Sequence, residues 1–306
     1  MTNEKLDRIK TISEYHELVG LPKPEHPLIS VVHFDSQEGS LFGESANLIL
    51  DFYFVILKRM KGFKYKYGQQ SYDFDEGVMG FVSPNQVFAV EIVPDLNVKR
   101  SGWMLLIHPD FLWNTTLAEG IKRYEYFDYS VHEALFLSDK EERTLNGVVE
   151  NIRQEYYSGI DKFSKNIIIS HLEALLNYAD RFYHRQFITR EKANSLILER
   201  LEKLLTNYFD TDNLVAKGLP TVHWVAGQLS VSPSYLSSLL RVLTGQNTQQ
   251  HIHEKLIERA KEQLSTTDLS VGEIAYRLGF EHSQSFNRLF KAKTHLSPSE
   301  FRQSFK

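Results

Sequence analysis

The sequence contains no cysteine among its 306 residues, which excludes disulfide bonds, cysteine-ligated zinc sites and thiol catalysis together. It also has no run that approaches the roughly 20 apolar residues of a helix that crosses a bilayer. The N-terminal segment MTNEKLDRIK carries charges with no apolar stretch behind them, unlike a secretory signal. We therefore expect a soluble, cytoplasmic protein with no membrane partner.

Neither sign of charge is in large excess, since the net charge is -4, but the charges are unevenly distributed. Residues 216–306 hold 11 lysines and arginines against 7 acidic residues, a net charge of +4. The preceding residues hold 24 against 32, a net charge of -8. A basic segment on an acidic chain fits one domain that approaches phosphate groups and another that avoids them.

The C-terminal region carries the same helical pattern twice, 49 residues apart. Thr221 and Ser270 each suit the N-cap position of a short helix, and Glu273 completes a capping box with Ser270. Behind each cap, apolar residues recur at the i, i+3, i+4 and i+7 spacing of an amphipathic helix. These residues are Val222, Val225, Ala226 and Leu229 in the first copy and Val271, Ile274, Ala275 and Leu278 in the second.

A second helix is expected after a tight turn in each copy. Ser232 and Pro233 suit the N-cap and the first position of one such helix, and Gly279 suits a left-handed turn residue before the other. The apolar stripes of these helices are Leu236, Leu239, Leu240 and Leu243, then Phe286, Leu289 and Phe290. The side chains left on the outer faces are Ser234, Tyr235, Ser237, Ser238 and Arg241, then Ser283, Gln284, Asn287, Arg288 and Lys291.

A short helix, a tight turn and a second helix with a polar outer face form the helix-turn-helix arrangement, whose second helix enters the DNA major groove. Gln, Asn, Arg and Ser side chains suit base edges, while Lys and Arg also suit phosphates. Alternatively, both units are ordinary helical hairpins with solvated faces. Two copies in tandem favour the helix-turn-helix interpretation.

Two such units joined by a helix near Thr248–Ser265 resemble the DNA-binding domain of AraC/XylS transcription regulators over about the last 90 residues. Two features depart from the family pattern. His295 stands where the family usually has glycine, and the first recognition helix is rich in serine. The residues that carry the resemblance are Ile274, Ala275, Leu278, Gly279, Phe280, Ser285, Phe286, Arg288, Phe290, Lys291, Leu296, Ser297, Pro298 and Phe301.

Several short strand-like segments, separated by turn residues, precede these helices, which is typical of a small antiparallel barrel or sandwich. In the resembled family this part is often a cupin-like barrel that binds a small effector. We therefore expect an α+β protein with a cupin-like antiparallel barrel at residues 1–137 and an all-α C-terminal domain. Inward residues such as Phe52, Phe54, Phe81 and Trp103 would line an effector site. The predicted strands are Leu28–Phe34, Ala46–Leu57, Phe63–Tyr67, Gly77–Ser83, Gln86–Ile92 and Gly102–His108.

Histidine is absent from residues 62–86, where a metal-binding cupin would carry a His-x-His pair. His251 and His253 point to different faces of a helix and make a poor chelate. We therefore expect no metal, no cofactor and no enzymatic activity. A cupin-type sugar-phosphate isomerase is the enzymatic alternative, and the missing metal ligands disfavour it.

Residues 138–209 change to a helical period, with Ser138 and Glu141 forming a capping box at their start. The last of three predicted helices spans about Arg190–Tyr208. The resemblance implies that these helices dimerise the barrel; the equal alternative is that they cover an open barrel face. A polar segment at 210–218 then opens the DNA-binding region, which we place at residues 210–306.

Together these observations predict a sequence-specific DNA-binding transcription regulator. The expected partners are double-stranded promoter DNA, RNA polymerase, a small effector of unknown identity and a second copy of the chain. An interaction adaptor that does not bind DNA is the remaining alternative. The candidate DNA-binding residues are Ser234, Tyr235, Ser237, Ser238, Arg241, Ser283, Gln284, Ser285, Asn287, Arg288 and Lys291.

Overall fold

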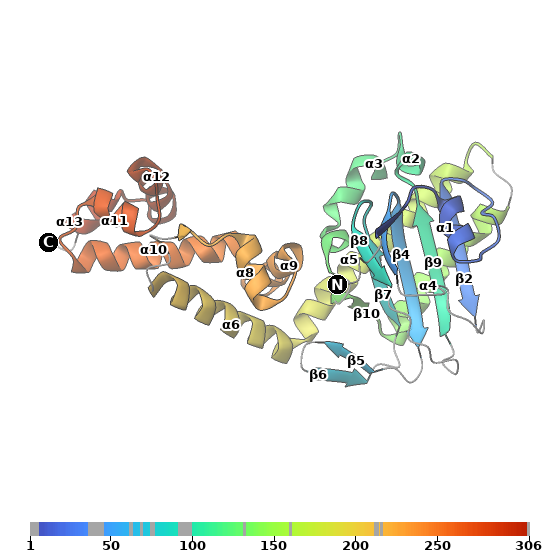
Figure 1. The fold of residues 1–306 in the computed structure, drawn as a ribbon, viewed down its shortest axis with the longest axis horizontal. Coiled ribbons are helices and arrows are strands. Elements are labelled where there is room, and N and C mark those ends of the chain that lie inside the picture. Colours follow the sequence, from blue (N-terminus) through green and yellow to red (C-terminus); the bar gives the residue numbers. More distant parts are fainter. Residues whose placement is uncertain are drawn as a thin grey trace. The chain divides into compact units, whose positions relative to one another are not determined.

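The computed structural model describes residues 6–35, 46–60, 64–67, 70–73, 77–90, 100–130, 133–158, 161–210, 214 and 217–304. The chain divides into two compact units, Met1–Gln186 and Phe187–Lys306. The N-terminal unit combines strands and helices, whereas the described part of the C-terminal unit contains helices only (Figure 1). None of the helices in the described ranges combines the length and apolar character that crossing a bilayer demands.

The N-terminal unit contains a five-stranded sheet in the order β10-β7-β4-β9-β2. Every neighbouring pair in it is antiparallel, and β4 and β9 lie at its centre. The strands predicted near residues 28–34, 77–83 and 102–108 are confirmed as β2, β7 and β9. The five strands are β2 (Ile29–Asp35), β4 (Tyr53–Met60), β7 (Val78–Val82), β9 (Arg100–Ile107) and β10 (Leu135–Phe136).

The remaining described strands form two smaller sheets. One has the order β1-β3-β8, in which β1 (Leu6–Ile9) runs parallel to β3 (Ala46–Leu50) and β3 runs antiparallel to β8 (Val87–Val90). The other pairs β5 (Lys64–Tyr67) with β6 (Gln70–Asp73). Phe63 and residues 91–92 of the predicted strands lie outside the described residues.

The predicted cupin-like antiparallel barrel is not confirmed. Within the described ranges the strands form three separate sheets and no closed barrel, and the β1–β3 pair is parallel. Only the coarser prediction, a mixed α and β protein with a helical C-terminal region, is confirmed. A strand pattern indicates which residues are extended, but closure depends on which edge strands pair, and the pattern does not specify this.

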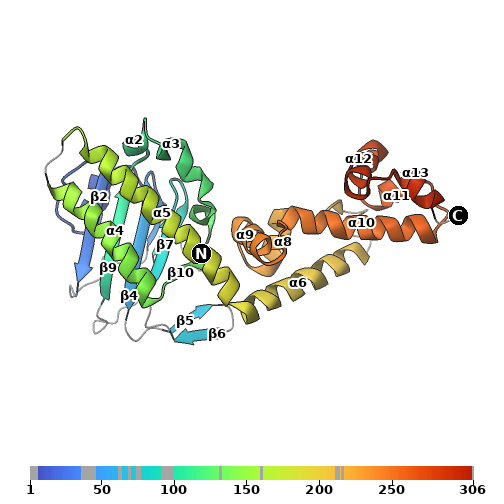
Figure 2. The same cartoon turned by 180° about the vertical axis from the view of Figure 1, so that it is seen from behind.

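Helices cover both faces of the five-stranded sheet. The covering helices are α1 (Ile12–Leu18), α4 (Asp139–Tyr157) and α5 (Ser164–Thr189). The unit also contains α2 (Pro109–Leu112), α3 (Leu117–Gly120) and 3-10 turns at Ile121–Arg123 and Glu125–Asp128. α4 and α5 lie across one face (Figure 2), where Trp103 Nε1 donates a 2.8 Å hydrogen bond to Asn146 of α4. On the other face, α1 contributes Tyr15, whose ring lies 6.0 Å from Phe52 and 5.9 Å from Phe54.

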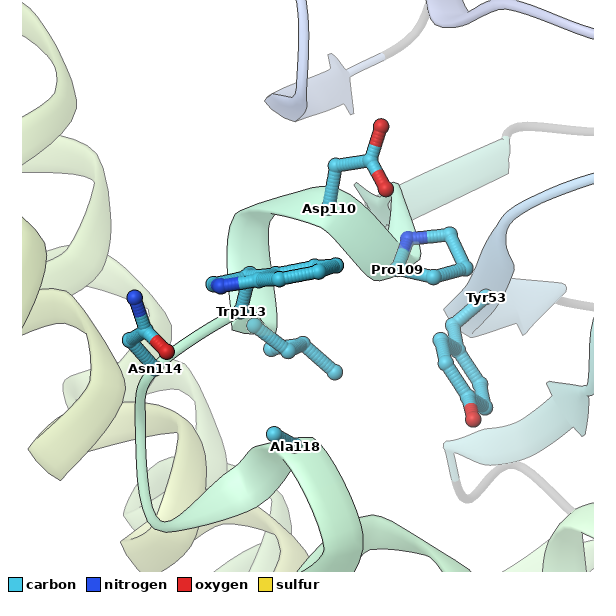
Figure 3. Close-up of a pocket in the computed structure, with 7 residues that line it drawn as sticks. Tyr53, Pro109, Asp110, Trp113, Asn114 and Ala118 are labelled. Carbon is cyan, nitrogen blue, oxygen red and sulfur yellow. The ribbon is translucent and has the colours of Figure 1, made fainter.

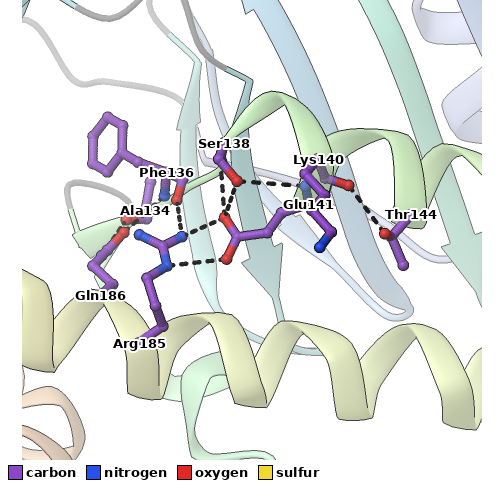
Figure 4. A network of polar contacts seen from close by, with 8 residues as sticks. All are labelled: Ala134, Phe136, Ser138, Lys140, Glu141, Thr144, Arg185 and Gln186. Carbon is purple, nitrogen blue, oxygen red and sulfur yellow. Dashed lines mark hydrogen bonds and ion pairs between the residues drawn. The ribbon is translucent and has the colours of Figure 1, made fainter.

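A polar network links the start of α4 to the end of α5 (Figure 4). Ser138 caps α4, and the predicted capping box with Glu141 is confirmed. Arg185 of α5 donates to both carboxylate oxygens of Glu141, at 3.0 and 2.7 Å, and to the Phe136 carbonyl at 2.8 Å. A two-pronged guanidinium–carboxylate pair of this kind fixes the direction of both side chains.

The neighbouring Gln186 satisfies two backbone groups beside β10. Its side-chain oxygen accepts a 2.9 Å hydrogen bond from the Phe136 N–H, and its side-chain nitrogen donates a 3.1 Å bond to the Ala134 carbonyl. Gln186 is only 1% exposed. Because β10 is an edge strand, these groups have no neighbouring strand to pair with, and the glutamine amide takes that place.

The C-terminal unit contains both predicted pairs of short and recognition helices and the helix that joins them. Its helices are α6 (Glu191–Asp210), α8 (Val222–Leu229), α9 (Pro233–Thr244), α10 (Thr248–Thr266), α11 (Val271–Arg277), α12 (Ser283–Thr294) and α13 (Pro298–Gln303). They share one apolar core that runs from Leu201 of α6 to Phe290 of α12. The predicted polar break at 210–218 is only partly described, since 211–213, 215 and 216 lie outside the described residues.

The position of α6 differs from the prediction. Its stripe residues Leu201 and Leu205 are 1% and 4% exposed, and they belong to the same core as Val225 of α8 and Leu256 of α10. This helix therefore packs within the compact unit that begins at Phe187. The boundary that we place at residue 210 stays a prediction. An amphipathic stripe shows that one face of a helix is buried but does not identify what it packs against.

The two repeats differ in where they place glycine. Ser230, with φ 59°, and Gly279, with φ 82°, occupy matching turns, while Gly245, with φ 77°, and His295, with φ 63°, end the two recognition helices. A left-handed backbone brings a Cβ atom too close to the following carbonyl, so only glycine adopts it freely. Each repeat therefore has one relaxed and one strained left-handed residue.

We expect His295→Gly to raise the free energy of unfolding of the C-terminal unit by about 0.5–1 kcal/mol, because it removes the Cβ strain at the end of α12. Gly245→Ala, the reverse change at the matching position of α9, should lower it by about 1–2 kcal/mol. Urea denaturation followed by circular dichroism measures both changes. Equal effects of the two substitutions would show that backbone strain does not govern these positions.

Candidate nucleic-acid interface

The first helix-turn-helix, formed by α8 and α9, is built from two side-chain caps. Thr221 Oγ1 accepts a 3.1 Å hydrogen bond from the Trp224 N–H, and Ser232 Oγ accepts a 3.2 Å bond from the Tyr235 N–H. Pro233 follows Ser232 at the first helical position, where a missing N–H costs nothing. The turn between the helices is therefore specified by local sequence.

The second helix-turn-helix, formed by α11 and α12, begins with the predicted capping box. The Ser270 N–H donates to Glu273 at 2.7 Å, and the Glu273 N–H donates to Ser270 Oγ at 3.2 Å. Hydrogen bonds from the Ser270 side chain and backbone lower the pKa of the Glu273 carboxyl. In the turn, a Cβ atom at Gly279 would lie 2.9 Å from the Leu214 carbonyl oxygen, so glycine is required by space as well as by φ.

Aromatic packing holds α12 in place. Phe286 and Phe290 are both fully buried, and their ring centroids lie 5.7 Å apart. Phe280 of the turn packs 5.5 Å from Phe286, and Phe301 of α13 packs 5.5 Å from Phe290. One face of α12 is thus committed to the core, which leaves the opposite face for a partner.

The outer face of α12 presents every side chain that the sequence places there. Gln284, Asn287, Arg288 and Lys291 are all exposed and follow the i, i+3, i+4, i+7 spacing of one helix face. Ser283 and Ser285 are exposed beside them. Arg288 and Lys291 are exposed cations that suit phosphates or base edges. The charge of Lys291 also contributes to lowering the pKa of the Glu300 carboxyl, after the hydrogen bonds from Ser297.

Tyr235 of α9 is buried in the structure, although the sequence pattern places it on the outer face. It is 2% exposed, and its ring packs edge-on against Phe187 with 5.2 Å between centroids, so the prediction that it faces outward is wrong. The buried stripe of α9 is wider than its leucines alone. A tyrosine has an apolar ring and a polar tip, so the residue type alone does not decide whether it faces the core or the solvent. The sequence pattern also does not indicate that Phe187 packs against this ring.

The other candidate residues of α9 are less exposed than those of α12. Ser234, Ser237 and Ser238 are half-buried, whereas Arg241 is exposed. The Ser237 hydroxyl lies 3.0 Å from the Thr248 hydroxyl of α10, which is itself fully buried. The Ser237 hydroxyl is therefore already engaged inside the unit.

The four residues that we expected to line an effector site are core residues. Phe52, Phe54, Phe81 and Trp103 are between 0% and 5% exposed. Phe81 packs among other aromatic rings, the nearest being that of Tyr126 with its centroid 4.4 Å away. All four side chains are buried, and the pocket described next is not lined by any of them.

An open pocket of about 320 Å³ lies elsewhere in the N-terminal unit, between β4 and the segment around α2 (Figure 3). Trp113 is 67% exposed at its edge, and burial and the charge of Asp128 raise the pKa of Tyr53. Among the described residues, no group of His, Cys, Asp or Glu could hold a metal. The pocket is lined by Tyr53, Pro109, Asp110, Leu112, Trp113, Asn114 and Ala118.

A family of helix-turn-helix domains matches residues 225–304. An uncharacterised HTH-type transcriptional regulator, YijO of Escherichia coli K12, is 37% identical over 81 residues, covering 26% of this chain and 29% of that protein. The HTH-type transcriptional activator RhaS of Escherichia coli O1:K1 is 36% identical over 84 residues, covering 27% of this chain and 30% of that protein. The C-terminal domain of AraT, a response regulator of Geobacillus stearothermophilus, is 29% identical, covering 35% of this chain and 84% of that one, with a TM-score of 0.31.

These similarities concern the C-terminal region. The chain spans less than a third of the length of YijO or RhaS. Residues 225–304 are a helix-turn-helix domain, and the resemblance to AraC/XylS regulators that the sequence predicted is confirmed for this domain. The matched range begins within α8 and ends after α13, so it contains both recognition helices.

Proposed function

We propose that this protein is a sequence-specific DNA-binding transcription regulator whose C-terminal unit places α9 and α12 in successive segments of the major groove. The main support is the outer face of α12, where exposed Gln284, Asn287 and Arg288 are held by a fully buried aromatic stripe. Successive major-groove segments on one face of DNA lie about 34 Å apart. Within the C-terminal unit, α10 joins the two helix-turn-helix motifs, and all of them share one core. The target site would therefore have a fixed internal spacing.

Selection of bound fragments from random DNA tests this proposal directly. A regulator should enrich a common bipartite motif, and purified protein should then shift that motif in a gel at lower concentration than a scrambled control. Enrichment of no motif, with folded protein confirmed by circular dichroism, would favour the interaction adaptor instead. Homodimerisation, a contact with RNA polymerase and a cytoplasmic location stay predictions of the sequence.

Alanine at Gln284 or at Arg288 should each weaken binding to the selected motif by about 1–3 kcal/mol, because each side chain can make two hydrogen bonds to one base. Specificity should relax at one position of the motif for each substitution. Gel-shift titration gives the loss of affinity. Gln303→Ala on α13 and Arg200→Ala on α6 are matched controls, since both residues are exposed and lie outside the recognition helices. Wild-type affinity of the Gln284 and Arg288 double variant would remove both side chains from the interface.

We also propose that the N-terminal unit regulates DNA binding through a small ligand in the pocket beside Trp113. Its volume of about 320 Å³ falls at the lower end of the range of small-molecule sites. A ligand can only shift an equilibrium between conformations if it binds one of them better. Regulation therefore requires that the pocket differ between a DNA-binding and a non-binding conformation.

A thermal-shift screen of small metabolites tests the pocket. A ligand that stabilises the wild-type protein should stabilise Trp113→Ala much less, because the exposed indole forms one wall of the site. Ile188→Ala removes another exposed apolar side chain and serves as the control. A ligand that stabilises all three proteins equally would bind somewhere else.

A further inference from the structure

The two recognition helices can be compared position by position because their buried residues share one register. Leu236 and Leu240 of α9 correspond to Phe286 and Phe290 of α12, and all four are fully buried. The same offset, 50 residues, pairs Ser234 with Gln284, Ser237 with Asn287, Ser238 with Arg288 and Arg241 with Lys291. Each side chain on the outer face of α9 can therefore be compared with the side chain at the equivalent position of α12.

α9 offers little that distinguishes one base from another. A serine hydroxyl both donates and accepts, so it can pair with any base edge, and its short side chain reaches only a close partner. Ser237 already bonds to Thr248, and Tyr235 is buried against Phe187. Among the candidate residues of this helix, Arg241 is the one in the exposed class.

α12 offers the side chains that discriminate. Gln284 and Asn287 can each bind adenine through two hydrogen bonds, and Arg288 can bind guanine in the same way. All three are exposed, and they project from adjacent turns of one helix face. Lys291 and Lys293 add exposed positive charge toward the end of the helix, where a phosphate contact would fix the register.

We infer that the two helix-turn-helix motifs divide the work. α12 reads the base sequence, while α9 binds mainly to the sugar-phosphate backbone and the shape of the DNA and tolerates many sequences. This inference rests on the proposed function, because it concerns the same DNA. The target site would then have one half rich in sequence information and one half nearly free of it. Backbone contacts position a protein without specifying sequence, and base contacts supply the specification.

The information content of the selected motif provides the first test. The wild-type protein should enrich a motif with one informative half. Scrambling that half should weaken binding by at least about 100-fold, and scrambling the other half by less than about 10-fold. Selection with the Gln284→Ala and Arg288→Ala double variant should lose information in the informative half. Selection with Ser234→Ala and Ser238→Ala together should return the wild-type motif.

A transplanted pair of side chains provides the second test. Ser234→Gln together with Ser238→Arg places in α9 the residues found at the matching positions of α12. This variant should acquire a sequence preference of at least about 10-fold in the previously tolerant half-site. Ser234→Ala with Ser238→Ala is the control, since it changes the same positions without adding hydrogen-bonding reach.

The outcomes separate the inference from the proposed function. If the wild-type protein enriches no motif, the proposed function is wrong, and the inference, which depends on it, is wrong as well. If it enriches a motif with two equally informative halves, DNA binding stands and the division of work is wrong. The division is equally wrong if the serine-to-alanine variant enriches a different motif, or if the transplanted variant folds and binds with no new preference.

Discussion

Replacing Phe290 with alanine is expected to lower the free energy of unfolding of the C-terminal unit by about 3–5 kcal/mol. Phe290 is fully buried, and its ring packs against Phe286 at 5.7 Å and Phe301 at 5.5 Å. Removing it deletes apolar contacts and leaves a cavity in a stripe that holds α12. Because the free energy of unfolding of a folded domain is only about 5–15 kcal/mol, this substitution would remove a large part of the stability of the C-terminal unit.

Urea denaturation followed by circular dichroism measures this loss, and a gel shift should show weakened DNA binding in parallel. Tyr276→Ala on α11 is the matched control, because it removes an aromatic ring that is 66% exposed in the same helix-turn-helix. It should cost less than about 0.5 kcal/mol. Similar losses of stability for the two variants would contradict the conclusion that buried aromatic packing holds α12 in place.

Replacing Gln186 with methionine should destabilise the N-terminal unit by about 2–5 kcal/mol, since one buried and one partly buried backbone group would lose their partners. The side chain is nearly the same size, so packing changes little. The Phe136 N–H and the Ala134 carbonyl, bonded now at 2.9 and 3.1 Å, would be left unsatisfied. Amide hydrogen exchange over residues 133–137 should accelerate along with the loss of stability.

Gln154→Met in α4 is the control for this prediction. Gln154 is exposed, and its bond to Glu150 at 3.3 Å faces solvent, so water replaces it at little cost. We expect a change within about 0.5 kcal/mol. If Gln186→Met leaves both stability and exchange near β10 unchanged, the glutamine amide does not serve as the missing neighbour of this edge strand.

Local signals in the sequence predicted local structure well. The caps at Thr221, Ser232 and Ser270 were read from residue type and spacing, and the structure confirms each of them. Gly279 was expected in a left-handed turn and has φ 82°. These features depend on neighbours within four residues, so a single sequence contains all the information they need.

Features that depend on distant partners were not predictable in the same way. Tyr235 was placed outside because the ring that covers it, Phe187, lies 48 positions away in the sequence. The stripe of α6 was recognised, but the identity of the core it joins was not. Barrel closure is not confirmed for a related reason, since pairing at the ends of a sheet is decided by the whole fold.

The left-handed residues of the two repeats have a consequence for how binding specificity can be altered. Ser230→Gly and His295→Gly act at separate sites, so their gains should add to about 1–2 kcal/mol. A typical single substitution costs about 1 kcal/mol. A protein carrying both glycines could therefore absorb a disruptive exchange on α12 and still fold, which would make it a more evolvable starting point for new target sequences than the natural chain.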